Sequence, residues 1–136
     1  TFRVSGSATA PEINVVGLGN TISNNKFLTT STDGTFLGVV TGSATSLSSS
    51  FTIQNTGTEN LTISGITMRR GSSSAFSVAN VPTSIVPASS ADFTISYDAS
   101  KGSQMDTVAI ASNDGDEAVY LFTVSAGGVV ASLDNN

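Results

Sequence analysis

The alternation of apolar and polar residues is clearest between residues 85 and 126, where three strand-like segments follow one another. Residues 91–97, 106–112 and 118–126 each place apolar side chains at every second position. Side chains alternate between the two faces of a strand, so this period of two predicts β-structure. β-Branched and aromatic residues dominate all three segments, and no helical period competes. We therefore expect consecutive strands whose aromatic side chains lie in the core.

The last of these segments is apolar on both faces. Tyr120, Phe122 and Val124 share one face, whereas Val119 and Leu121 lie on the other. A strand that is apolar on both sides is typical of a central or covered position in a sheet. We expect this position for residues 118–126.

Shorter segments of the same kind precede this region. Further strands are predicted within residues 11–17, 35–40, 45–55, 61–68 and 75–78. Residues 20–34 are polar and rich in turn formers, which predicts a loop; Gly57 is expected at a positive φ in a turn and Gly65 at a bulge. About seven or eight short antiparallel strands without a helix predict an all-β, two-sheet β-sandwich, with a small barrel or jelly roll as the alternative.

The first residues repeat a motif from the end of the domain. Phe-x-Val-Ser occurs at residues 2–5 and again at residues 122–125. We therefore interpret residues 1–9 as an end strand or linker from a preceding repeat. Residues 10–127 then form the sandwich domain, and residues 128–136 form a linker or tail. The chain has the character of a fragment from a longer protein.

Composition excludes several functions. The 136 residues contain no Cys, His or Trp, which rules out disulfides, Cys-based zinc sites and a histidine base. A net charge of −5 with only five basic residues argues against nucleic-acid binding. No apolar run reaches the ~18 residues that a membrane span needs. Only 11% of the residues are charged, as in many secreted or surface β-proteins. We expect no enzyme activity, no cofactor and an extracellular or cell-surface location.

The acidic segment between the last two predicted strands is the one dense group of oxygen ligands. Asn113, Asp114, Asp116 and Glu117 lie within five residues. Ca²⁺ binds carboxylate and carbonyl oxygens, so these residues are candidate calcium ligands. The alternative is a solvated hairpin turn, because Asn and Asp stabilise turns through their own side chains.

Aromatic residues outside the predicted core are the candidates for ligand binding. Most aromatic residues are assigned to the core, which leaves Phe27 and Phe36 as candidates for a glycan, since carbohydrate sites usually present exposed aromatic rings. Residues 60–62 form an N-glycosylation sequon, Asn-Leu-Thr, which we interpret as a chance occurrence.

A set of motifs resembles the choice-of-anchor D repeats of bacterial surface proteins, relatives of the ASPM, SPD-2 and hydin (ASH) domains. The resemblance covers residues 11–127 and rests on an Asn-Thr-Gly turn at 55–57 and a Ser-Asn-Asp run at 112–114. The segments that carry it are residues 11–15, 36–40, 51–63, 86–95 and 110–125. It implies an immunoglobulin-like sandwich related to major sperm protein and PapD-type pilus-chaperone domains. It also implies non-catalytic modules, either on large secreted or anchored bacterial proteins or in ciliary and centrosomal scaffolds.

Two functional hypotheses follow. The first is a structural spacer or a protein-interaction and adhesion module, whose partners are neighbouring domains of the same polypeptide or another protein. The second is a carbohydrate-binding accessory module; a scaffold domain in a ciliary or cytoskeletal assembly is a further alternative. Residues 1–9 are also expected to promote self-association by pairing with a sheet edge.

Overall fold

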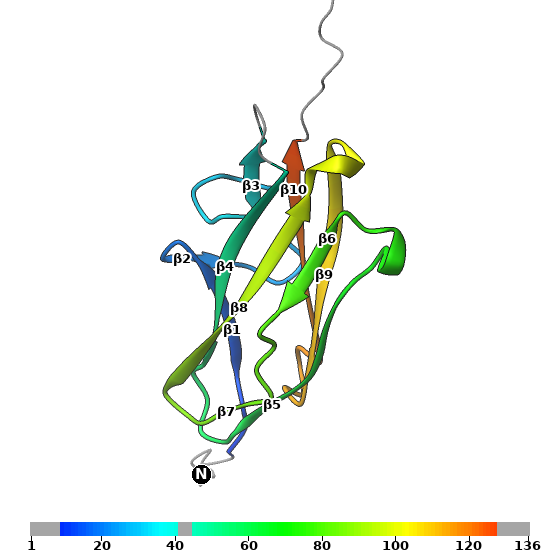
Figure 1. Cartoon of the computed structure of the whole chain (residues 1–136). Coiled ribbons are helices and arrows are strands. Elements are labelled where there is room, and N and C mark those ends of the chain that lie inside the picture. Colours follow the sequence, from blue (N-terminus) through cyan, green and yellow to red (C-terminus); the bar gives the residue numbers. More distant parts are fainter. Residues whose placement is uncertain (1–8, 41–44, 128–136) are drawn as a thin grey trace, which may run out of the picture.

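Two five-stranded sheets packed face to face form the structure, a computed structural model that describes residues 9–40 and 45–127 (Figure 1). The first sheet has the order β2-β1-β4-β8-β6, with β1 (Ile13–Gly17), β2 (Asn20–Ile22), β4 (Ser46–Asn55), β6 (Phe76–Ala79) and β8 (Ser89–Asp98). The second has the order β3-β10-β9-β5-β7, with β3 (Phe36–Val39), β5 (Leu61–Met68), β7 (Ser84–Ile85), β9 (Gln104–Ser112) and β10 (Val119–Gly127). Two short 3₁₀ helices are η1 (Gly71–Ser73) and η2 (Ala99–Lys101). The predicted all-β sandwich is confirmed.

Aromatic side chains fill the space between the sheets, as the alternation predicted. Phe51 of β4 packs against Phe93 of β8 and Phe122 of β10, with ring centroids 5.7 and 5.6 Å apart. All three rings are fully buried, and burying one such side chain stabilises the fold by about 2–3 kcal/mol. Tyr120 of β10 lies beside them and donates a 2.6 Å hydrogen bond from its hydroxyl to the carbonyl of Ile22. This bond joins the two sheets.

The predicted central position of the last strand is confirmed. β10 pairs antiparallel with β9 along its whole length and parallel with β3 on its other side. The loop predicted over residues 20–34 is only partly correct. Asn20–Ile22 forms β2, and Lys26 makes an isolated parallel bridge to Phe122. Polar residues form strands here because the free edges of β1 and β10 offer them backbone partners.

Two glycine predictions had different outcomes. The bulge at Gly65 is confirmed, since the register of β5 against β9 shifts between Ile63 and Gly65. The positive φ at Gly57 is wrong. Gly57 is required by close approach instead, because a Cβ atom there would lie 2.3 Å from the carbonyl oxygen of Ala10 and 2.6 Å from the nitrogen of Glu12.

The chain enters and leaves the sandwich at opposite ends (Figure 1). We call the end where β1 begins the entry pole and the end where β10 finishes the exit pole. At the entry pole, Ala10 accepts hydrogen bonds from the backbone of Thr58 and Glu59 at 2.8 and 3.3 Å. At the exit pole, Val40 donates to the carbonyl of Gly127 at 2.9 Å. The predicted strand from a preceding repeat (residues 1–9) and the predicted tail (residues 128–136) lie outside the described residues, apart from Thr9. Within residues 9–40 and 45–127, no helix is long and apolar enough to cross a membrane.

Candidate functional site

The acidic turn between β9 and β10 meets the start of β1 at the entry pole. Carboxylate oxygens of Glu12, Asp114, Asp116 and Glu117 all lie within 4.8 Å of one another. Three of these four residues are the predicted calcium candidates. Glu12 was missed, because its partners lie about a hundred residues further along the chain and only the tertiary fold brings them together. We call these four residues the acidic cluster.

Asp114 fixes the turn to the first sheet. Its side chain is buried at 2% exposure and accepts hydrogen bonds from the backbone nitrogens of Ile13 and Asp116 at 2.9 and 3.2 Å. Burial alone would raise the pKa of the Asp114 carboxyl, but the hydrogen bonds, that from Ile13 first, outweigh it and lower the pKa. Asp114 therefore stays ionised, and its charge is satisfied by backbone donors.

The other three carboxylates destabilise one another. Burial raises the pKa of Glu12 and of Glu117, and the neighbouring negative charges raise both further. The pKa of Asp116 is raised by its hydrogen bond with Asp114 and by the charge of Asp114. Near neutral pH the negative charges of these carboxylates repel one another, and a hard cation bound between them would reduce that repulsion. The cluster can supply a few carboxylate oxygens to Ca²⁺, with water completing the six to eight ligands.

The side chain of Asn113, the fourth predicted ligand, binds the backbone around the beginning of β5. Its side-chain oxygen accepts a 2.8 Å hydrogen bond from the backbone nitrogen of Thr62, and its amide nitrogen donates to the carbonyl of Asn60 at 3.3 Å. Both bonds hold the beginning of β5. Asn113 therefore connects the β9–β10 turn to β5 through its side chain.

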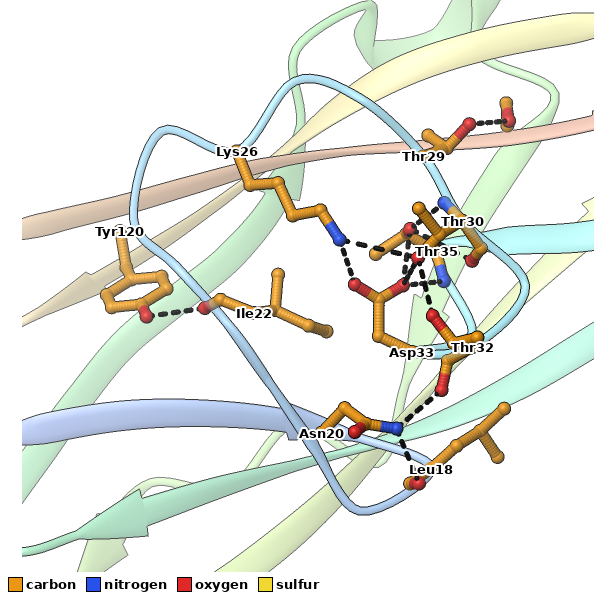
Figure 2. A network of polar contacts seen from close by, with 11 residues as sticks. Leu18, Asn20, Ile22, Lys26, Thr29, Thr30, Thr32, Asp33, Thr35 and Tyr120 are labelled. Carbon is orange, nitrogen blue, oxygen red and sulfur yellow. Dashed lines mark hydrogen bonds and ion pairs between the residues drawn. The ribbon is translucent and has the colours of Figure 1, made fainter.

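A second polar group closes the loop between β2 and β3 (Figure 2). The ammonium group of Lys26 pairs with the carboxylate of Asp33. One oxygen of Asp33 also accepts from the Thr35 backbone nitrogen at 3.0 Å and from the hydroxyls of Thr35 and Thr30 at 2.6 and 2.9 Å. Burial raises the pKa of Asp33, but these donors, led by Lys26, lower it to about 2. So acidic a group is a poor general base, and the network has a structural role.

The two phenylalanines proposed for ligand binding lie on different parts of the surface. Phe27 is 55% exposed in the loop between β2 and β3. Phe36 is partly buried and lines a groove of about 470 Å³ at the exit pole, together with Arg70, Gln104 and Met105. Phe27 is not part of this groove, so the groove does not bring the two rings together.

The sheets, their order and their two poles define an immunoglobulin-like sandwich domain. The family model described as HYDIN/CFA65/VesB-like, Ig-like domain matches residues 28–126, and the chain belongs to this family. The kinship with ASH-type domains that the sequence motifs indicated is confirmed. The comparison with curated proteins finds no match in sequence.

Solved structures resemble the chain in fold. A protein of unknown function from Porphyromonas gingivalis W83 has a TM-score of 0.65 and 18% identity over 90% of this chain and 50% of its own length. The ASH / PapD-like domain of human CEP192 (PapD-like domain 7) has a TM-score of 0.61 and 10% identity over 97% of this chain and 96% of its own length. The Vibrio cholerae VesB protease has a TM-score of 0.53 and 17% identity over 76% of this chain and 30% of its own length. The chain spans only half the length of the P. gingivalis protein.

Proposed function

We propose that the chain is a non-catalytic immunoglobulin-like module of a larger secreted or cell-surface bacterial protein, in which it acts as a structural spacer between neighbouring domains. The observation that carries this proposal is the placement of entry and exit at opposite poles, each fastened to the body of the sandwich by backbone hydrogen bonds. A rigid module that holds the chain at both ends keeps the domains before and after it at a fixed distance. The nine residues of β10 alone span about 30 Å.

The experiment replaces the domain within its parent protein. One variant receives an unrelated sandwich domain with termini at opposite ends, and another receives a Gly/Ser linker. Because this chain has no cysteine, spin labels can be placed on introduced cysteines in the flanking domains, and pulsed EPR gives their separation. A spacer predicts that the sandwich variant keeps a narrow distance distribution and the parent's function, whereas the flexible linker broadens the distribution. Loss of function in both variants would instead indicate a binding module.

The location has its own test. The low charge and hydroxyl-rich surface support an extracellular parent. An export signal in the full-length gene would agree with this, whereas a parent without one would favour the scaffold alternative in a ciliary or cytoskeletal assembly.

Carbohydrate binding is the alternative that the exposed ring of Phe27 favours. It predicts hits on a glycan array that disappear in the Phe27→Ala variant or, for the exit-pole groove, in Phe36→Ala. An array without hits would eliminate it.

Calcium binding by the acidic cluster is a further candidate, favoured by carboxylate oxygens within 4.8 Å of one another. Titration with Ca²⁺ alone is expected to release or absorb heat and to raise the melting temperature, and the Asp116→Asn variant should lose both effects. An unchanged melting temperature at millimolar Ca²⁺ would remove this candidate.

A further inference from the structure

Charged side chains are segregated between the two ends of the molecule. The entry pole holds five carboxylates and, among the described residues, no basic group: Glu12, Glu59, Asp114, Asp116 and Glu117. The exit pole holds three basic residues, which are Arg69, Arg70 and Lys101. The other charges in the described ranges are the Lys26–Asp33 pair, the exposed Asp92 of β8, and two carboxylates near the exit pole.

Those two carboxylates already have local partners. Asp98 caps η2 by accepting a 2.9 Å hydrogen bond from the backbone nitrogen of Ser100. Asp106 is buried and accepts from the backbone nitrogens of Arg70 and Thr107. Within residues 9–40 and 45–127 the one ion pair joins Lys26 and Asp33. The guanidinium groups of Arg69 and Arg70 therefore have no carboxylate partner in this part of the chain.

The groove at the exit pole combines this positive charge with apolar surface. Phe36 of β3, Met105 of β9 and Gly127 of β10 line it, and Arg70 lies at its side. Met105 is 52% exposed, which is unusual for a methionine in a folded domain. An apolar patch beside cations that have no carboxylate partner among the described residues is suited to a partner that presents a short acidic loop.

The entry pole of the same fold presents such a loop. The turn at residues 113–117 is short, Asp116 is exposed, and no heavy atom lies within 4 Å of a Cβ placed on Gly115. We infer that the exit-pole groove receives the acidic β9–β10 turn of a second domain of the same kind, in a head-to-tail contact. This inference rests on the proposed spacer function, because in a string of such domains the exit pole of one faces the entry pole of the next.

A contact of this kind is weak between separate molecules. The groove is small, and exposed ion pairs contribute little and are screened over a distance of about 8 Å at physiological salt. Linking two domains raises the effective concentration to the millimolar range, so the same contact becomes populated within one polypeptide. The expected role is to restrict the angle between successive domains.

The test is the self-association of the full 136-residue chain by sedimentation velocity. At about 20 mM NaCl the weight-average mass should rise with protein concentration, and about 0.5 M NaCl should weaken association at least tenfold. The double variant Arg70→Glu/Lys101→Glu should remain monomeric, and so should Asp116→Lys/Glu117→Lys. Mixing the two variants should restore association, because each then meets a pole of opposite charge. Asp92→Lys, a charge reversal on β8 away from both poles, should associate like the unaltered chain.

Several outcomes would overturn the inference. A chain that stays monomeric at about 1 mM and low salt would do so, because tethered domains reach only that effective concentration. Association of Asp116→Lys/Glu117→Lys at the normal level would point to a contact between two exit poles. Association that resists salt and is abolished by deleting residues 1–9 would point to edge-strand pairing. Far-UV circular dichroism and a cooperative thermal melt must first show that each variant is folded. A negative result here leaves the spacer proposal standing, since domain replacement in the parent tests that separately.

Discussion

The two poles of the sandwich are built in opposite ways. At the entry pole, the buried side chains of Asn55 and Asp114 accept hydrogen bonds from the backbone of the incoming chain. At the exit pole, the end of β10 is held by the backbone bond from Val40 to Gly127 and by the hydroxyl contact between Thr29 and Ser125. Arg70 lines the groove there and makes no ion pair within the described ranges. The difference separates two roles for polar residues. The buried polar side chains at the entry pole fix the direction of the chain, whereas the exposed charges at both poles, Arg70 at one and Asp116 at the other, are available to a partner.

Asn55 is the centre of the entry pole and gives the largest expected effect. It is 1% exposed; its side-chain oxygen accepts from Gly57 and Glu12 at 3.0 and 3.3 Å, and its amide nitrogen donates to Glu59 and Ile85 at 2.7 and 2.8 Å. Asn55→Ala leaves these backbone groups without partners, so we expect a loss of about 3 kcal/mol in the free energy of unfolding.

Urea denaturation measures this loss. The matched control is Gln54→Ala, which removes a partly exposed amide bonded to Asn14 and should cost less than about 1 kcal/mol. Equal effects of the two substitutions would mean that the entry pole is not fastened by Asn55.

Gly57 comes next, because the incoming chain passes directly over it. In Gly57→Ala the new methyl group would meet the backbone of Ala10, Pro11 and Glu12 at 2.3–2.8 Å, and backbone cannot yield as a side-chain tip can. We expect a loss of about 2 kcal/mol, comparable to overpacking a core. Gly115→Ala, at a position with open space, is the control and should be close to neutral. A neutral Gly57→Ala would show that residues 10–12 can move away freely.

The hydrophobic pattern along the sequence predicted the strands and the faces that they bury. The alternation at residues 91–97 gave a strand and its buried face, and the double-sided apolar character of residues 118–126 gave the central place of β10. The parts that were missed depend on contacts between distant segments. A carboxylate oxygen of Glu12 lies within 4.8 Å of one of Asp114 in the β9–β10 turn, and Gly57 is required by the close passage of Ala10. No residue near either position in sequence signals these contacts.

Asp33 offers a test in which pH replaces mutation. The Lys26 and threonine donors hold its pKa at about 2, below the ordinary value of 3.8. Because the pKa is lower in the folded chain, the ionised Asp33 stabilises the fold. This contribution to the free energy of unfolding is complete above pH 3.8 and is lost as the pH falls from there towards 2. It amounts to about 2 kcal/mol.

The Asp33→Asn variant should therefore be less stable by about this amount at neutral pH, and the difference from the unaltered chain should shrink below pH 3. Denaturant titrations at several pH values measure it, with Asp92→Asn, an exposed carboxylate on β8, as the control. A difference that stays constant down to pH 2 would mean that the amide disturbs packing and that the charge contributes little.

Removing a charge from the acidic cluster should stabilise the fold, in contrast to Asp33→Asn, and this is the smallest of the expected effects. The pKa of Asp116 is raised by its hydrogen bond with Asp114 and by the charge of Asp114. A raised pKa in a folded acid means that ionisation destabilises the fold, and that this cost disappears as the pH falls through the raised pKa. Asp116→Asn should therefore raise the melting temperature at neutral pH by about 1–2 °C, and the gain should fade in acid and at high salt. Calorimetric melts at pH 7 and pH 4 measure both. A lower melting temperature in this variant would show that the Asp116 side chain stabilises the turn. The repulsion among the entry-pole carboxylates would then be too weak to affect stability.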